Sequence, residues 1–379
     1  MLLRERKLVA KTLFPAATGQ LVVDLPAIGS FSYLVFKVWA KNGSTSGTAQ
    51  KIYDAFSKLE VIGDASIPLY EMSGIVAYKL SQFLNGGVDT YQCNENAAAT
   101  QFAQFLIPFG RSLGDEQLWL DAGRYSSLQF RATYSFNTTA SGFDMTGTYY
   151  EVSAYEFVPT PTSRMGLARH VTSLSVTTAA SGDLIYRLPQ GNVIPAIYFY
   201  ANLDGVNASS IFDKVTLDVN DGAVKIKEMR PLDILYENEV ASWVSQRLSW
   251  VLYRADNATI NLPVSDIRNA QLTLQSDISA GQNFPYYTIA NINGNLLTTS
   301  GILITGGSTW GATTLDTTAR LIHLNVVGLG CSPLFKIVPG ASENIEDALN
   351  TREYGNVRLI FTQAVANATL QVIPVEILA

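Results

Sequence analysis

Charged residues are scarce in this sequence. Of its 379 residues, 15% are Asp, Glu, Lys or Arg, against roughly 25% in an average soluble domain. The mean hydropathy is positive, at +0.13. Because such a surface is hard to keep in water as a monomer, we expect much of it to be buried against further copies of the chain.

Histidine and cysteine are also rare. Only His170 and His323 could serve a hydrolytic triad or a histidine metal site. His170 follows Arg169 and is interpreted as a surface residue, whereas His323 lies in an alternating run and is expected to face solvent or an interface. Cys93 and Cys331 are far apart without metal-type spacing, which favours reduced buried thiols over a disulfide. The sequence therefore predicts no enzyme, no catalytic residue, no metal and no cofactor.

Long apolar runs are missing too. No stretch reaches the roughly 18 residues of a membrane span, and residues 1–7 contain no apolar core of signal-peptide length. We therefore expect neither membrane insertion nor Sec-type export. The net charge of −6 argues against a protein that coats nucleic acid. The one concentrated basic stretch, Arg4, Arg6 and Lys7, is expected to be either a solvated tail or an arm that contacts a partner or an anionic membrane surface.

What the sequence does contain indicates many short strands. Runs of β-branched and aromatic residues, such as 21–23 and 196–200, lie between clusters of Gly, Asn, Ser and Pro. The length suits two domains, each with its own core. We predict a mainly β protein with two domains.

A repeat gives the strongest internal evidence. Residues 16–26 return as residues 179–189, with six of eleven positions identical. Residues 61–72 are matched by residues 218–229, and each segment has turn residues between alternating apolar positions, which predicts a β-hairpin. Each hairpin is followed by a helical pattern, capped by Ser73 in the first copy and beginning with Pro231 in the second.

Two further pairs extend the repeat. Residues 105–110 pair with 335–340 at an offset near 231, and residues 128–130 pair with 370–372 at an offset of 242. The jump in offset after the second pair predicts a large insertion in the second copy, at about 240–330, in a turn-rich and strand-like stretch. The proline-punctuated segment 159–163 predicts a domain boundary near residue 160.

Two sandwiches in one chain, each entered by a strand that ends in Leu-Pro, resemble a known family. The stretch 105–130 carries the likeness most clearly: Ile107-Pro108-Phe109, then Arg111, then a Leu-rich strand, a turn and an alternating strand. It is similar to the double jelly-roll major capsid proteins shared by adenovirus hexon, large DNA viruses and tailless bacteriophages with an internal membrane. The second copy differs, since it has Lys336 and Gly340 and no equivalent arginine.

The resemblance implies an all-β fold of two tandem eight-stranded jelly-roll β-sandwiches, with a few short helices and a large loop insertion in the second. The expected divisions are an N-terminal arm at 1–15, a first jelly roll at 16–158, a linker at 159–166 and a second jelly roll at 167–379.

The same resemblance implies a major capsid protein, made in the host cytoplasm, that forms homotrimeric pseudo-hexagonal capsomers of an icosahedral virion. Its partners would be other copies of itself, penton or vertex proteins and an internal lipid membrane touched by Arg4, Arg6 and Lys7, with no sequence-specific nucleic acid. The insertion would face outward or between subunits.

Two other functions stay open at this point. One is a secreted carbohydrate-binding or glycan-processing protein, with Tyr286 and Tyr287 as the best candidates for an aromatic platform. The other is a minor spike or vertex protein of a virion.

Overall fold

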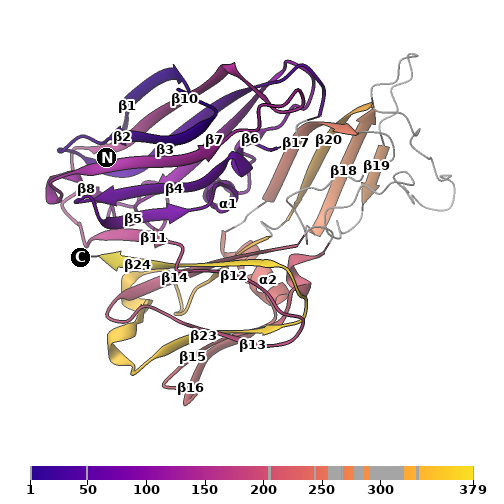
Figure 1. Cartoon of the computed structure of the whole chain (residues 1–379). Helices are drawn as coiled ribbons and strands as arrows, with labels where there is room; N and C mark the ends of the chain where they lie inside the picture. The colour runs from indigo at the N-terminus through magenta and orange to yellow at the C-terminus, as the bar shows by residue number, and fades with distance from the viewer. Residues whose placement is uncertain are drawn as a thin grey trace, which may run out of the picture.

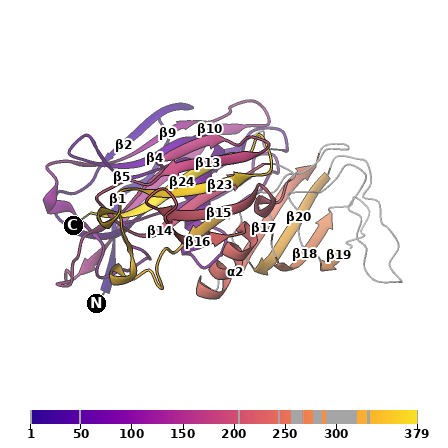
Figure 2. The same cartoon turned by 90° about the horizontal axis from the view of Figure 1, so that it is seen from below.

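The computed structural model describes residues 2–47, 50–203, 206–242, 245–254, 266, 268–276, 286–289, 320–329 and 333–378. Two β-sandwiches lie against each other, and a smaller sheet lies at one end of them (Figure 1). The predicted all-β class is confirmed. Both chain termini lie at the end of the molecule opposite the smaller sheet, as a second view makes clear (Figure 2).

The first sandwich consists of two facing sheets. One has the order β1-β10-β3-β7-β6, with β8 paired to β3; the bounds are β1 (Leu2–Leu13), β3 (Ser30–Asn42), β6 (Tyr91–Gln92), β7 (Thr100–Pro108), β8 (Leu120–Asp121) and β10 (Phe143–Val158). The other has the order β2-β9-β4-β5, with β2 (Thr18–Asp24), β4 (Phe56–Gly63), β5 (Ile67–Met72) and β9 (Leu128–Ser135). In each sheet a late strand lies between two early ones, β10 between β1 and β3 and β9 between β2 and β4, as in a jelly roll.

The second sandwich repeats this order. One sheet runs β11-β24-β14-β21, with β12 on β24 and β22 on β14; the bounds are β11 (Leu167–Val171), β12 (Leu174–Thr177), β14 (Val193–Asn202), β21 (Leu334–Ile337), β22 (Leu349–Asn350) and β24 (Thr369–Leu378). The other runs β13-β23-β15-β16, with β13 (Gly182–Arg187), β15 (Phe212–Val219), β16 (Val224–Met229) and β23 (Val357–Gln363). Between β10 and β11, residues 159–166 form neither a helix nor a named strand.

Strand order shows which parts of the two copies correspond. The first three pairs of the repeat fall on equivalent strands: β2 and β13, the hairpins β4-β5 and β15-β16, and β7 and β21. The fourth pair, 128–130 with 370–372, is wrong. Strand β9 pairs with β2 and β4 as β23 pairs with β13 and β15, whereas β24 corresponds to β10. The true equivalents Leu128 and Val357 are 229 positions apart.

Both predicted helices are present, each after its hairpin. They are α1 (Gly74–Leu84) and α2 (Pro231–Ser242). Ser73 occupies the N-cap position of α1, but its hydroxyl makes no capping bond and donates instead to Gln371 Oε1 at 3.2 Å. Short 3₁₀ turns complete the elements: η1 (Tyr53–Ala55), η2 (Ala122–Arg124), η3 (Ala208–Ser210), η4 (Ile345–Asp347) and η5 (Thr351–Glu353).

The segment interpreted as an N-terminal arm is a strand. Leu2–Leu13 pairs antiparallel with β10, from Leu2 opposite Val158 to Leu13 opposite Tyr149. Most of its side chains are exposed on both faces, so it lacks the alternation of a half-buried strand. Its strand character comes from the ladder with β10, which lies far away in the sequence.

The described part of the insertion forms a sheet of its own. Its order is β17-β20-β18-β19, with β17 (Ser245–Arg254), β18 (Arg268–Ser276), β19 (Tyr286–Ile289) and β20 (Arg320–Leu329). In the chain these strands lie between α2 and β21. We call them the inserted sheet.

The apolar core has two parts. The second sandwich holds one cluster, in which Phe199 and Phe335 stack with ring centroids 4.6 Å apart. The core of the first sandwich is continuous with Tyr198 of β14 and with Leu248 and Trp250 of β17. Apolar burial at roughly 25 cal/mol per Å² therefore ties the first sandwich to both of its neighbours.

Candidate assembly surfaces

The described residues contain no group of three or more His, Cys, Asp or Glu side chains that could hold a metal ion. The two histidines lie on different sheets, His170 on β11 and His323 on β20. His170 is 1% exposed, so its interpretation as a surface residue was wrong. Cys93 is a buried free thiol whose pKa is raised to about 11, mainly by burial, and Cys331 lies outside the described residues.

His170 should make stability pH-dependent. Burial lowers its pKa from 6.5 to about 4, so between these values the unfolded chain binds a proton that the folded chain does not. The free energy of unfolding should therefore fall by about 3 kcal/mol between pH 7 and pH 4 from this residue alone. Urea denaturation at several pH values measures the slope, and the variant His170→Gln should show a shallower one. An unchanged slope in that variant would contradict this assignment.

In the described part of the chain, one pair of parallel strands links a sheet of the first sandwich to a sheet of the second. His170 of β11 lies opposite Tyr70 of β5, and Val171 lies opposite Glu71. This pairing merges two sheets into one ten-stranded sheet. The Arg169 guanidinium strengthens the junction by donating through Nε to the carbonyl of Pro68 at 2.9 Å.

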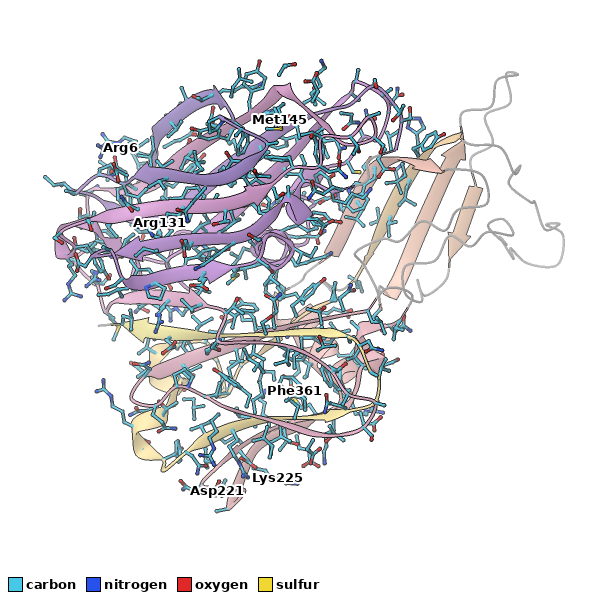
Figure 3. The ribbon with its side chains drawn as sticks, viewed as in Figure 1. Arg6, Arg131, Met145, Asp221, Lys225 and Phe361 are labelled. Carbon is cyan, nitrogen blue, oxygen red and sulfur yellow. The ribbon has the colours of Figure 1, made fainter. Side chains whose placement is uncertain are left out.

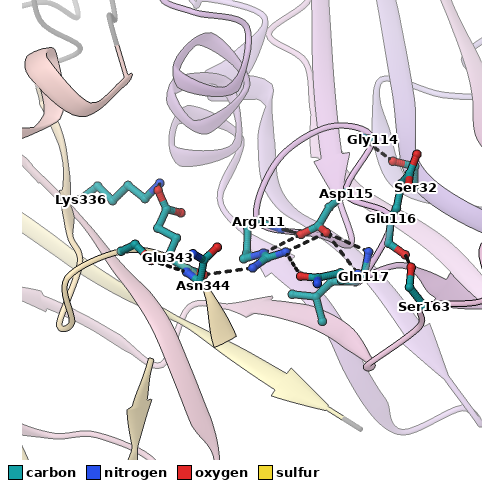
Figure 4. A network of polar contacts seen from close by, with 12 residues as sticks. Ser32, Arg111, Gly114, Asp115, Glu116, Gln117, Ser163, Lys336, Glu343 and Asn344 are labelled. Atoms are coloured by element: carbon teal, nitrogen blue, oxygen red, sulfur yellow. Dashed lines mark hydrogen bonds and ion pairs between the residues drawn. The ribbon is translucent and has the colours of Figure 1, made fainter. Parts of the chain in front are cut away.

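A polar network spans the same junction (Figure 4). Arg111 donates to both carboxylate oxygens of Asp115, at 2.7 and 3.0 Å, and through Nη1 to the carbonyl of Glu343 in the second sandwich at 3.2 Å. Lys336 forms an ion pair with Glu343. Burial opposes the charge on Lys336, but Tyr198 and Glu343 outweigh it and raise the pKa of this lysine. The Arg111 singled out by the sequence therefore joins the first sandwich to the second.

A cavity of about 420 Å³ lies beside this network, lined by Arg111, Asp115, Tyr198, Lys336 and Glu343 among others. Its cations and carboxylates are already paired with one another. The absence of an Arg111 equivalent in the second copy is consistent with this arrangement, because Lys336 already lies at the junction.

The three basic residues of the N-terminus lie on β1 and contact carboxylates of β10. Arg4 donates through Nε to Glu156 Oε1 at 2.8 Å, Arg6 lies 3.9 Å from Glu156 Oε2, and Lys7 lies 3.1 Å from Glu151 Oε2. Both glutamates are buried, at 4% and 7% exposure. Sequence reasoning missed these two partners because they lie about 150 positions away. The predicted contact of the basic residues with a membrane stays a prediction.

Comparisons with known proteins agree on one architecture. No protein-family model matches the chain, and no curated protein is significantly similar. The structure does match the MCP of STIV, with a TM-score of 0.55 and 8% identity over 99% of this chain and 96% of that one. It also matches the Sulfolobus turreted icosahedral virus structure, with a TM-score of 0.58 and 8% identity over 99% of this chain and 90% of that one. A third match is the major capsid protein P2 of bacteriophage PM2, with a TM-score of 0.51 and 11% identity over 100% of this chain and 98% of that one. The chain has the double jelly-roll fold.

Within this double jelly roll, the inserted sheet contacts the first sandwich although it belongs to the second by sequence. Strand β17 bridges in parallel to the segment 88–94, and Val251 N donates to the carbonyl of Cys93 at 2.9 Å. Trp250 Nε1 donates to Asp89 Oδ2 at 2.6 Å. Burial raises the pKa of Asp89 to about 6, despite hydrogen bonds from Tyr78, Tyr91 and Trp250.

Two sequence expectations concern other parts of the double jelly roll. Tyr286 and Tyr287 lie on β19, but their side chains are outside the described residues. Among the helices described, none is long and apolar enough to cross a membrane.

Proposed function

We propose that this chain is the major capsid protein of an icosahedral virus, with a structural role in the virion shell and no catalytic step. The observation that carries the proposal is the extent of the structural likeness. It covers 99–100% of this chain and 90–98% of three capsid structures, so the same two-sandwich body accounts for nearly all of each protein. The low content of charged residues supports a surface that is buried against other copies.

The proposed assembly unit is a homotrimer. Three chains with two equivalent sandwiches each present six similar bodies around one axis, which suits a position of local six-fold symmetry in a shell. The equivalence of the two sandwiches in strand order supports this proposal.

The proposed orientation follows from the two ends of the molecule. The termini lie at one end and the inserted sheet at the other (Figure 2). We place the inserted sheet on the outer surface of the shell and the termini toward the interior, where the segment with Arg4, Arg6 and Lys7 lies near a lipid surface or another virion protein. Penton or vertex proteins of the same virion are the further partners.

The molar mass in solution tests this proposal. Light scattering on a sizing column should give about three times the chain mass of 41.2 kDa, and electron microscopy of the same peak should show a six-sided ring. A monomer at every concentration that binds immobilised glycans would overturn the capsid function and favour the carbohydrate-binding alternative.

A further inference from the structure

The duplication places equivalent strands in two different environments. Strand β1 corresponds to β11, because β10 and β24 hold them in the same register. Arg4 lies opposite Glu156 and forms an ion pair with it, as Arg169 does with Glu376. Arg4 and Arg169 are therefore equivalent positions.

Strand β16 corresponds to β5 in the same way. In the two hairpins Met72 and Met229 lie opposite Leu59 and Val215. Both ladders also shift register at the same place, at Leu69 in β5 and at Ile226 in β16. It follows that Lys227 is equivalent to Tyr70 and Glu228 to Glu71.

These equivalent strands differ in what covers them. Strands β5 and β11 pair with each other, and at their contact Tyr70 is 0% and His170 is 1% exposed. Strands β1 and β16 are terminal strands of their sheets, and no strand in the described part of the chain pairs with their outer edges. Both carry mostly exposed or half-exposed side chains. Unpaired strand edges of this kind are templates for another strand.

The two open edges cannot meet within one chain. Strand β1 lies on one side of the molecule and β16 on the opposite side, as Figure 1 shows for the strands and Figure 3 for Arg6 and Lys225. Between these sides the β5–β11 junction has already joined the two sandwiches.

We propose that β1 of one copy pairs in parallel with β16 of a second copy, reproducing between subunits the β5–β11 junction found within the chain. This inference rests on the proposed homotrimer and defines its interface. The register follows from His170 opposite Tyr70 and Val171 opposite Glu71. It places Glu5 opposite Lys227 of the partner subunit and Arg6 opposite Glu228 of the partner subunit.

The charges on the two edges support this register. Each of the two pairs joins a carboxylate to a cation, so neighbouring charges attract at both positions. The Arg6 and Glu228 side chains are 44% and 37% exposed in the single chain, so both are accessible to a second copy. Arg6 lies 3.9 Å from the buried Glu156, which Arg4 contacts more closely. Glu228 forms ion pairs with the exposed side chains of Lys214 and Lys225. Within the chain, Arg169 donates to the carbonyl of Pro68. Arg4 is equivalent to Arg169, so in the proposed interface it would donate to the equivalent backbone carbonyl in β16 of the second copy.

Such a contact joins two different surfaces and therefore continues from copy to copy until a ring closes. A ring of three chains contains three junctions within chains and three between them, all with the same strand pairing.

Charge reversal tests this interface. Arg6→Glu and Glu228→Arg should each raise the concentration at which half the chains are trimeric by about tenfold or more, because like charges then face each other. The double variant R6E/E228R restores opposite charges and should restore assembly toward the wild-type level. Sedimentation velocity measures the association, and circular dichroism at 20 μM checks that every variant is folded. The matched control is Arg187→Glu, on the exposed opposite edge of the sheet that contains β16, and it should assemble like the wild type.

The possible results separate this interface from the proposed function. If both single variants form trimers as tightly as the wild type, the β1–β16 contact is wrong while the homotrimer stands. If the double variant is as defective as the single ones, the pairing of Arg6 with Glu228 is wrong. If the wild type itself is a monomer at every concentration, the homotrimer and its interface both fall.

Discussion

Removing residues 1–13 is expected to prevent the first sandwich from folding. Strand β1 covers the edge of β10 along most of that strand, and its cations lie against two buried carboxylates, Glu151 and Glu156. Glu151 would keep Lys37, 3.1 Å away, but Glu156 would lose Arg4 and Arg6, and a buried carboxylate left without its cation costs up to about 3–5 kcal/mol. The lost ladder along β10 adds to this cost, against the 5–15 kcal/mol that stabilises an ordinary domain. The truncated chain should be largely insoluble, or should lose the cooperative thermal transition of the wild type by circular dichroism.

A variant that keeps β1 paired gives the control. Leu2 is 74% exposed, so Leu2→Ser removes apolar surface without touching the ladder and should melt within a few degrees of the wild type. Normal melting of the truncated chain would support the earlier interpretation of this segment as a tail or arm.

The sequence predicts the duplication well because local chemistry determines it. The turn residues of the two hairpins are an example: Asp64 and Ala65 in the first, and Asn220 and Asp221 in the second, all have positive φ. Such turns favour Asn, Asp and Gly, and so they leave a signal in the sequence. Strand alternation around them then indicates the register.

Strand identity is harder to predict than strand existence. Residues 128–130 and 370–372 share an alternating apolar pattern, yet the first belongs to β9 and the second to β24, which occupy different sheets of the jelly roll. A pattern of three residues does not determine which strands the segment pairs with in the sheet. The 3₁₀ turns would have been a better guide, since Asp121 and Asn350 each accept a bond from the backbone two residues on, just before β9 and β23.

Burial that depends on distant partners leaves little local signal. His170 lies on a short strand that is buried between β5 and β24, both far away in the sequence. The basic residues of β1 suggested a solvated segment, since their partners Glu151 and Glu156 follow far along the chain. The contact of the inserted sheet with the first sandwich belongs to the same class, because Trp250 and Asp89 are 161 positions apart.

Backbone hydrogen bonds, apolar packing and the contacts of Trp250 attach the inserted sheet to the first sandwich. The Trp250 ring is 1% exposed and packs edge-on against Tyr91 at 5.5 Å between centroids. Its Nε1 donates to Asp89, which also accepts from the Tyr78 hydroxyl of α1 at 2.8 Å. A second tie lies further along β17, where the backbone N–H of Tyr253 donates to Glu95 Oε2 at 2.7 Å. The Trp250 side chain thus makes both a ring contact with Tyr91 and a hydrogen bond to Asp89, and removing it removes both contacts.

Trp250→Ala is therefore expected to release the inserted sheet while the second sandwich stays folded. Replacing a buried Trp by Ala costs about 3–5 kcal/mol, and here the cost falls on one local unit. Hydrogen exchange measures it: the amides of Arg247 and Val251, which donate to Gly87 and Cys93, should exchange at least about 100-fold faster by the usual conversion of 1.4 kcal/mol per factor of ten. Amides of β23 in the second sandwich should keep their rates. The control Trp250→Phe retains an aromatic ring but no donor for Asp89, so its effect should be smaller, at about 1–3 kcal/mol. Equal acceleration in β17 and β23 would mean that the chain unfolds as a whole, and would contradict a separable inserted sheet.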